Sequence, residues 1–324
     1  MENNMILHED KKVFIDAIRI TSDYYSTREI FVEKDYWATY LLKKLSQSDF
    51  KDKVVFKGGT SLSKAYDLIN RFSEDVDIAI LNAKDYSGNA IKELIKRVEE
   101  TLTVGLIEVE LEGITSKHSK IRRTAFNYEK VISHKGEAGI LDKIVLEINS
   151  FANPLLYEER SIDCMIGKFF YEKGFLYFRE KYGIKSFTVN TLSPRQTLVE
   201  KLVSLFRFSF SDNPGKILES KIRHFYDIYF LTESKYCKDY IESKEFIDDF
   251  KAMYDEDILK FDEPENWRGS KMKDSPLITS FSNIWDHLSP IYERELGGLV
   301  YGSLMSHKLI HERTTYIIDR IADY

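Results

Sequence analysis

Residues 56–80, FKGGTSLSKAYDLINRFSEDVDIAI, open with two glycines and close with two aspartates that are two positions apart. Side chains alternate between the faces of a strand, so Asp75 and Asp77 are predicted to share one face of the DVDIAIL strand. Two neighbouring carboxylates repel each other and raise each other's pKa unless a cation lies between them. Mg²⁺ prefers carboxylates together with substrate phosphates, so the pattern predicts a site for Mg²⁺ or Mn²⁺. The alternative is a pair of hydrated aspartates on an exposed strand face.

The glycines before this strand supply a second chemical feature. Gly58 and Gly59 let the backbone approach a ligand closely, and the helix expected after them offers free N–H groups to a phosphate. Thr60 and Ser61 are candidate hydroxyl donors to the same phosphate. Ser73 is expected on the face of the aspartates, where it either positions a phosphate or caps the start of the strand. A phosphate cradle followed by a carboxylate pair is what transfer of a nucleotidyl or phosphoryl group requires.

A two-metal site commonly uses a third carboxylate, and the segment KIVLEIN at 143–149 offers one. The apolar residues at its even positions are expected to face the core, which leaves Glu147 on the opposite face. We therefore predict Glu147 as the third metal ligand, with Asp142 at the start of the strand as the alternative. The competing interpretation is that Glu147 only lies on the hydrated side of the sheet.

The elements that must position these residues follow from the apolar spacing. Helices are expected at 10–25, 28–48, 61–72 and 86–102, and strands at 53–57, 75–81, 106–113, 122–133 and 142–151. From Ser193, a predicted N-cap that is followed by Pro194, the chain is mainly helical. We predict an α+β fold with three parts: a mixed α/β core with N-terminal helices over 1–152, a connecting segment over 153–192 and a helical C-terminal domain over 193–324.

The composition, 43% hydrophobic and 31% charged, excludes a disordered chain and indicates a globular protein with a sizeable core. No apolar run reaches the roughly 18 residues that a membrane span needs, and the first residues do not resemble a signal peptide. Two cysteines, Cys164 and Cys237, exclude a disulfide framework and a zinc site made from cysteine alone. We expect a cytoplasmic protein that does not associate with membranes.

The net charge of −6 is unevenly placed. Residues 238–265 hold eleven acids against four lysines, a local balance of −7, so the rest of the chain is near +1. Residues 114–128 contain no acid and four cations, which are Lys117, Lys120, Arg122 and Arg123. A polyanion such as RNA could bind these four side chains, because each neutralised phosphate releases counterions. The alternative is a solvated hairpin or loop.

Four stretches carry a family resemblance, in order along residues 32–231. They are VEKDYWATYLL (32–42), the glycine–aspartate stretch of 56–80, VEKLVSLFRF (199–208) and KIRHFYDIYFL (221–231). Together they resemble the AbiEii/AbiGii toxin family, which includes the MenT toxins and belongs to the nucleotidyltransferase superfamily related to DNA polymerase beta. The resemblance implies a polymerase beta-like nucleotidyltransferase core with a mixed sheet and a helical C-terminal domain.

The resemblance also implies roles for individual residues. It makes Gly58, Gly59 and Ser61 the phosphate-binding turn and assigns the metal to the two aspartates. Lys201 matches the family's essential lysine, expected to hold the phosphates of the nucleotide, and Asp227 matches its late essential aspartate. From the residues alone, Lys201 reads equally as a surface lysine. Asp227 lies among aromatic residues, so it needs a partner if buried, and Arg223 one helical turn earlier is the nearest candidate.

The implied function is that of the toxin of a type IV toxin–antitoxin system, also called abortive infection. Such an enzyme uses a metal ion to transfer nucleotides from an NTP to the 3′ end of tRNA, which blocks translation. The implied partners are the tRNA acceptor stem, the NTP and an antitoxin encoded nearby. Two alternatives remain: transfer to a protein or small-molecule hydroxyl, and a non-catalytic module that binds an NTP or a partner.

Overall fold

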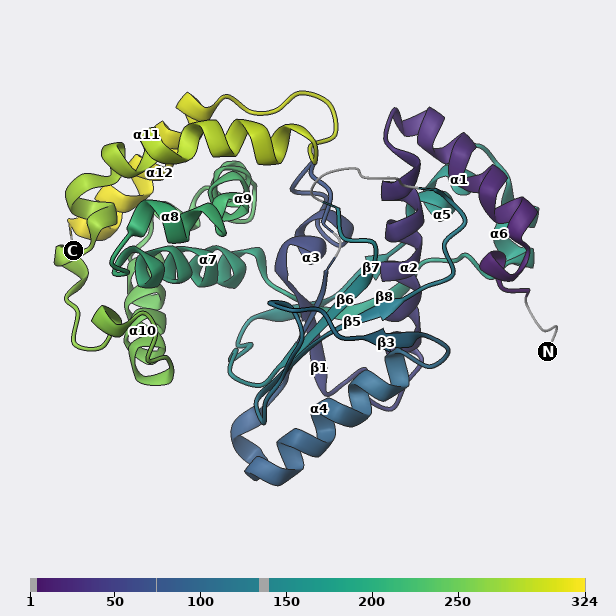
Figure 1. Cartoon of the computed structure of the whole chain (residues 1–324), viewed down its shortest axis with the longest axis horizontal. Coiled ribbons are helices and arrows are strands. Elements are labelled where there is room, and N and C mark those ends of the chain that lie inside the picture. The colour runs from purple at the N-terminus through teal and green to yellow at the C-terminus, as the bar shows by residue number, and fades with distance from the viewer. Residues whose placement is uncertain (1–4, 74, 134–139, 324) are drawn as a thin grey trace. The chain divides into compact units, whose positions relative to one another are not determined.

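The computed structural model describes residues 5–73, 75–133 and 140–323 (Figure 1). The chain forms two compact units. The first comprises Met1–Asp67 and Phe72–Leu192, and the second comprises Leu68–Arg71 and Ser193–Tyr324. The two aspartates of the opening stretch therefore belong to the first unit, whereas Lys201 and Asp227 belong to the second.

Eight strands in the described part of the chain form one mixed sheet, in the order β3-β5-β6-β2-β1-β8-β7 with β4 beside β5. The strands are β1 (Val54–Lys57), β2 (Val76–Ile80), β3 (Ile107–Val109), β4 (Ser116–Lys117), β5 (Ile121–Asn127), β6 (Ile144–Asn149), β7 (Tyr157–Ile162) and β8 (Phe187–Leu192). In the middle of the sheet, β2 runs antiparallel to β1 and parallel to β6. The apolar residues of these strands, such as Val76, Ile78 and Leu146, are fully buried and form the core.

The first unit also contains helices. They are α1 (Lys11–Tyr25), α2 (Glu29–Ser46), α3 (Gly58–Lys64), α4 (Gly88–Leu102), α5 (Met165–Glu172) and α6 (Leu176–Lys181), with short 3-10 turns η1 (Leu7–Glu9) and η2 (Ala83–Asp85). Helix α2 contacts β6 and β8, and α4 contacts β5 and β6. Helix α3 contacts β1 and β2, the two strands that it connects in sequence, so it lies close to the aspartates.

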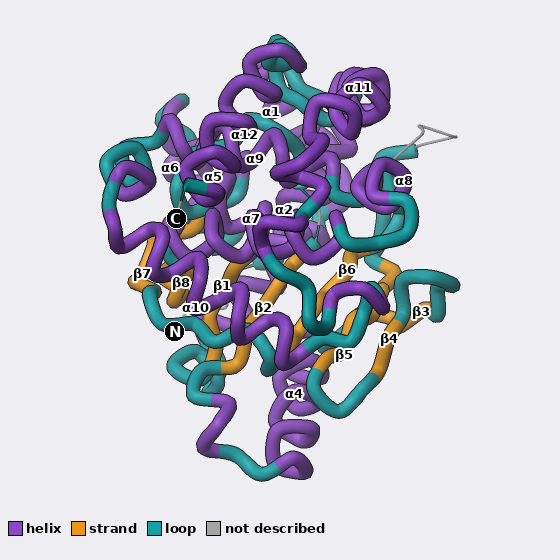
Figure 2. Tube along the Cα trace, turned by 90° about the vertical axis from the view of Figure 1, so that its left-hand side faces the viewer, coloured by secondary structure: helices purple, strands orange, loops and turns teal. Residues whose placement is uncertain are grey.

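The second unit is helical, as Figure 2 shows by colour. It contains α7 (Pro194–Ser209), α8 (Pro214–Glu219), α9 (Ile222–Glu233), α10 (Lys244–Lys260), α11 (Pro276–Gly297) and α12 (His307–Ala322), with 3-10 turns η3 (Tyr240–Glu242), η4 (Glu265–Trp267) and η5 (Met272–Asp274). Ser193 caps α7 as predicted, because its side chain accepts a hydrogen bond from the amide of Arg195. No helix among the described residues is long and apolar enough to cross a membrane.

The structure confirms the α+β class but differs from the sequence-based prediction in two places. The helix expected over 61–72 is wrong, since α3 starts at Gly58 and ends at Lys64. The helix cannot continue through Asp67, because that residue takes a positive φ of 55°. Residues 153–192, expected to form a connecting segment, hold β7, α5, α6 and β8.

The short segment Leu68–Arg71 belongs to the second unit although the chain on both sides of it belongs to the first. Arg71 forms an isolated antiparallel bridge with Val300, and the amide of Tyr301 donates to the carbonyl of Asn70 at 2.7 Å. Backbone pairing thus holds this segment to residues more than two hundred positions later. Asp75 follows Arg71 after only three intervening residues.

Candidate active site

Three carboxylates meet around the start of β2. Asp77 and Glu147 are register partners on the parallel strands β2 and β6, and Asp75 immediately precedes β2. Burial, together with the charges of Glu147 and Asp75, raises the pKa of the half-buried Asp77 carboxyl to about 8. The strand pairing therefore concentrates negative charge at one place in the sheet.

Helix α3 begins directly against the Asp77 carboxylate. Gly58, its first residue, has a φ of +77°, and a β-carbon added to it would lie 2.0 Å from Oδ2 of Asp77. A glycine is required here both for the backbone conformation and for the space. Lys57 is the register partner of Asp77 on β1, and its side chain does not cap α3. Gly59 is the second residue of α3.

Hydroxyl groups tie this turn to the segment that carries the aspartates. The Thr60 hydroxyl lies 2.9 Å from Oγ of Ser73 and 2.5 Å from the carbonyl oxygen of Asp75. Ser61 is fully buried and donates to the carbonyl of Gly58 at 2.8 Å. Ser61 and Thr60 thereby stabilise the turn, and Ser73 is held beside it.

Arg123 of β5 is a cation that pairs with two of these carboxylates. Its Nη2 lies 3.3 Å from Oδ2 of Asp75, and its Nε lies 3.9 Å from Oε2 of Glu147. Asn149 donates to the other oxygen of Glu147 at 3.2 Å. Arg123 was grouped with the RNA-binding candidates from its sequence neighbours, but the register of β5 and β6 turns it toward the carboxylates.

Two of the other RNA-binding candidates also have acidic partners within the chain. Arg122 pairs with Glu99 at 2.5 Å, and Lys117 pairs with Glu108. Lys120 is exposed. These pairs could not be seen from residues 114–128, which contain no acid, because both acidic partners lie outside that segment.

The residues present fit a divalent ion that shares its coordination with a substrate. No group of three or more His, Cys, Asp or Glu side chains within the described ranges is arranged to hold a metal ion, so the structure does not bring Glu147 together with both aspartates as a three-ligand site. Mg²⁺, however, is commonly bound by one or two carboxylates together with substrate phosphates. Asp75 and Asp77 match that donor set, and the pKa of Asp77 is raised first by burial and then by the charges of Glu147 and Asp75, which Lys57 and Arg123 offset only in part. Asp142, the alternative third ligand, pairs with Lys130.

A second charged cluster lies inside the helical unit. Asp227 of α9 is fully buried and accepts from Nε and Nη2 of Arg71, both at 2.7 Å, while Nζ of Lys201 lies 2.9 Å away. Burial alone would raise the pKa of Asp227, but Arg71 and Lys201 outweigh it and hold that pKa well below its ordinary value. Asp227 therefore forms ion pairs with Arg71 and Lys201, whereas the sequence analysis named Arg223 as the nearest candidate partner.

Arg71 is the member of this cluster that sequence reasoning missed. It is separated from Asp227 by 156 positions, and no periodic pattern relates two residues so far apart. Its burial gives the physical reason for the pair, because a fully enclosed guanidinium needs a carboxylate. Asp227 forms ion pairs with both Arg71 and Lys201, so its carboxylate is placed to fix the positions of these two cations.

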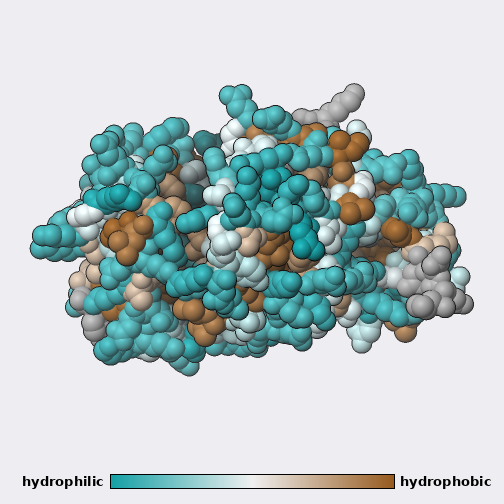
Figure 3. Space-filling model, turned by 90° about the horizontal axis from the view of Figure 1, so that it is seen from below, coloured by the Kyte–Doolittle hydropathy of each residue, from teal (hydrophilic) through white to brown (hydrophobic). Residues whose placement is uncertain are grey.

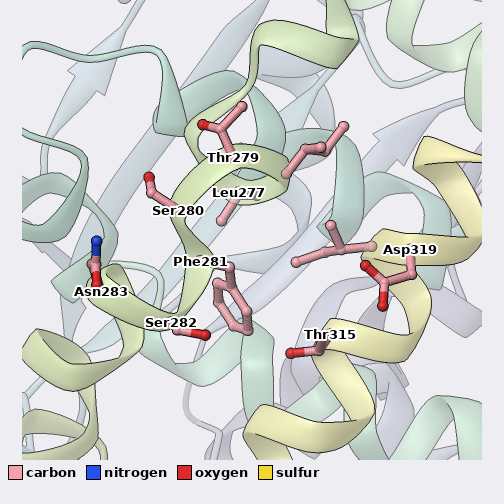
Figure 4. A pocket seen from close by; sticks show the side chains of 10 residues that line it. Leu277, Thr279, Ser280, Phe281, Ser282, Asn283, Thr315 and Asp319 are labelled. Atoms are coloured by element: carbon pink, nitrogen blue, oxygen red, sulfur yellow. The ribbon is translucent and has the colours of Figure 1, made fainter.

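Neither of two pockets in the structure is lined by the three carboxylates. The pocket in Figure 4, about 280 Å³, lies between α11 and α12 and is lined by residues that include Leu277, Phe281 and Asp319. The other, about 410 Å³, lies in the first unit and is lined by residues that include Tyr36 and Cys164. The carboxylate cluster is therefore distinct from both pockets.

Replacing Gly58 by alanine tests how closely α3 abuts Asp77. We expect Gly58→Ala to lower the free energy of unfolding by more than the roughly 1–2 kcal/mol of a left-handed alanine, because its β-carbon also collides with the carboxylate. Gly105→Ala is the matched control: Gly105 has a φ of +84° but nothing lies within 4 Å of its added β-carbon. Equal losses for the two variants in denaturant titrations would contradict the packing described.

The raised pKa of Asp77 predicts a pH effect on the metal-free protein. Folded Asp77 keeps its proton up to about pH 8, whereas unfolded Asp77 loses it near its ordinary value of 3.8. The unfolded state thus binds fewer protons in this window, so stability falls as pH rises, by at most about 1.4 kcal/mol per pH unit. Denaturant titrations with a chelator between pH 5 and 8 should show a flatter dependence for Asp77→Asn; identical slopes would exclude the raised pKa.

The buried Asp227 cluster predicts a large loss of stability in Asp227→Asn. Removing the charge leaves Arg71 and Lys201 buried without their counterion, which typically costs about 3–5 kcal/mol. Asp248→Asn, which breaks the exposed Lys244–Asp248 pair, should change stability by less than about 1 kcal/mol. Urea titrations of both variants measure the difference, and an Asp227→Asn protein as stable as Asp248→Asn would refute the cluster.

The chain is similar to known proteins at the level of family and fold. A family model described as "Nucleotidyl transferase AbiEii toxin, Type IV TA system" matches residues 40–281. Comparison with proteins of curated function gives no significant match. Among solved structures, the chain is similar to MenT4, a nucleotidyltransferase toxin from Mycobacterium tuberculosis H37Rv, with a TM-score of 0.52 and 17% identity over 95% of this chain and 90% of that chain.

A second solved structure, JHP933 from Helicobacter pylori, covers 91% of this chain and 93% of its own at 16% identity. Its TM-score of 0.45 is too low to establish a common fold. The likeness to MenT4 supports the fold, and the family model spans most of the chain, so the resemblance predicted from four sequence motifs is confirmed. The chain belongs to the AbiEii nucleotidyltransferase toxin family of type IV toxin–antitoxin systems.

Proposed function

We propose that this nucleotidyltransferase moves nucleotides from an NTP to the 3′ end of a tRNA and so blocks translation. The observation that carries the proposal is the register of β2 with β6, which sets Asp77 beside Glu147 and against the first turn of α3. In the reaction, an acceptor hydroxyl oxygen bonds to the α-phosphorus of the NTP. The bond from that phosphorus to the β-phosphate oxygen breaks, and pyrophosphate leaves with its electron pair.

Asp75 and Asp77 would hold Mg²⁺ or Mn²⁺ together with the phosphates of the NTP. Such an ion, when bound, neutralises charge on the triphosphate and orients the reacting oxygens. Glu147 completes the metal site or accepts the proton of the acceptor hydroxyl. Before substrate binds, Arg123 supplies positive charge to Asp75 and Glu147.

The turn at the start of α3 is proposed to bind phosphate through its backbone. Gly58 and Gly59 add no side chain of their own to this backbone, although the Asp77 carboxylate lies against Gly58, and Lys57 gives the helix no side-chain cap. Ser61 supports the turn from inside, because its hydroxyl already bonds to Gly58. Ser73, held by Thr60, remains a proposed phosphate contact.

Lys201 and Asp227 also remain proposed participants. The buried ion pairs support a positioning role for Asp227, which holds Lys201 and Arg71 in place, and Lys201 remains the proposed phosphate contact from the family resemblance. The remaining partner is an antitoxin, which the family implies, and we propose that the toxin acts in the cytoplasm, where tRNA and NTP are present.

A labelling experiment tests the reaction. Purified protein is incubated with total tRNA, Mg²⁺ and each α-³²P-labelled NTP in turn, and label on the tRNA is measured. We expect label from one or two NTPs, and a loss of at least about 100-fold in Asp75→Ala and Asp77→Ala, since these ligands supply several kcal/mol of transition-state stabilisation.

Glu147→Ala, a further test variant, is expected to lose activity. Asp142→Ala is the matched control and is expected to keep activity, because Asp142 pairs with Lys130. No label on tRNA from a folded and toxic protein would refute the tRNA acceptor and move the search to protein or small-molecule hydroxyls. Toxicity that persists undiminished in Asp75→Ala would favour a non-catalytic binding module.

A further inference from the structure

An aromatic surface on α5 and α6 is left uncovered by the rest of the first unit. We define this α5–α6 surface by five side chains: Tyr171 (65% exposed), Phe175 (41%), Leu176 (56%), Tyr177 (70%) and Phe178 (41%). Five large apolar groups within eight consecutive residues form an unusual concentration, because soluble proteins expose such groups mostly singly. A surface of this kind commonly marks a binding site.

The local structure explains why these groups stay exposed. Helix α5 buries Ile166, Phe169 and Phe170 against the unit, and the chain then turns at Gly174, which has a φ of +72°. Phe175 and Phe178 lean back on Phe170, with ring centroids 6.1 and 6.2 Å apart. These contacts fix the turn.

Tyr171 and Tyr177 are the outermost rings of the surface. The guanidinium of Arg179 lies over the ring of Tyr171 at 5.1 Å from its centroid. Tyr177 is 70% exposed and makes a T-shaped contact with Phe178, with centroids 5.6 Å apart and planes at 77°. Both tyrosines therefore present ring surface outward.

The segment that carries these rings is rich in cations, although the whole chain carries −6. Residues 165–185 contain five cations, Lys168, Lys173, Arg179, Lys181 and Lys185, against two acids, Glu172 and Glu180, which gives +3. Arg179 and Lys185 pair with acids of the chain, Asp163 and Glu180. Lys173 instead lies over the ring of Tyr24 at 4.1 Å and Lys181 over Tyr182 at 5.0 Å, so their charges lie beside aromatic faces.

Exposed aromatic rings interleaved with lysines indicate a ligand that combines flat apolar groups with negative charge. Single-stranded nucleic acid has this chemistry, since its bases stack on aromatic side chains and its phosphates attract cations. A protein partner fits less well, because lysine is depleted from protein–protein interfaces. The basic stretch at 117–123 is a weaker candidate, because three of its four cations have partners within the chain.

We propose that the α5–α6 surface binds unpaired bases of the RNA acceptor by stacking on Tyr171 and Tyr177, with Lys173 and Lys181 attracting the adjacent phosphates. The proposal rests on the proposed function, in which RNA is the acceptor. It adds a site for recognition that is separate from the carboxylates of β2 and β6.

Binding of a fluorescein-labelled, unstructured twelve-nucleotide RNA, followed by anisotropy, tests the surface without any catalytic step. Tyr171→Ala and Tyr177→Ala should each weaken binding at least about five-fold, the lower end for one base stack, and Tyr177→Phe should bind like wild type. Ile107→Ala, at a 70% exposed apolar side chain on β3, is the matched control and should have no effect. Lys173→Glu should weaken binding and reduce its salt dependence.

The same variants in the tRNA-labelling assay separate this proposal from the proposed function. If wild type binds the oligonucleotide through both tyrosines but labels no tRNA, the surface stands and the acceptor assignment fails. If wild type labels tRNA while the tyrosine variants bind and label as well as wild type does, the surface proposal is overturned. Loss of antitoxin binding by these variants, with RNA binding unchanged, would equally overturn it and assign the surface to a protein.

Discussion

The parallel pairing of β2 with β6 is the constraint on which the candidate active site depends. It places Asp77 beside Glu147 in the middle of a sheet, where burial and like charge make ionisation of Asp77 costly. Apolar residues on the other face of the strands hold this unfavourable arrangement in place, since Val76, Ile78 and Leu146 are fully buried. An enzyme that uses a divalent ion gains from such a cluster, because the ion and the substrate relieve the repulsion together.

A second electrostatic constraint is built inside the helical unit. Asp227 is the shared counterion of Arg71 and Lys201 in a site shielded from water. Arg71 belongs to the segment 68–71, and Ser73 and Asp75 follow this segment in the sequence. Loss of Asp227 would therefore affect more than one residue of the proposed machinery. A buried aspartate can be indispensable in this way without contacting substrate.

The sequence predicted the local parts of this account well. Alternation placed Asp77 and Glu147 on strands, whereas Asp75, expected on the same strand as Asp77, lies just before β2; the four motifs identified the family. Sequence reasoning failed where partners are distant or patterns are weak. Arg71 pairs with Asp227, 156 positions away. Arg123 was predicted to bind RNA from its basic neighbours, whereas the register of β5 with β6 pairs it with Glu147. Strand β7, YEERSI, lies at the sheet edge and lacks apolar alternation, so residues 153–192 gave no strand signal.

The central claim is that the carboxylates of β2 bind a divalent ion together with an NTP. Mn²⁺ titration followed by electron paramagnetic resonance, with a non-hydrolysable NTP analogue present, measures this directly. The account predicts tight binding to wild type, binding at least about ten-fold weaker in Asp75→Asn and Asp77→Asn, and little change in Asp142→Asn. Equal Mn²⁺ affinity in wild type and in the Asp75 and Asp77 variants would contradict it.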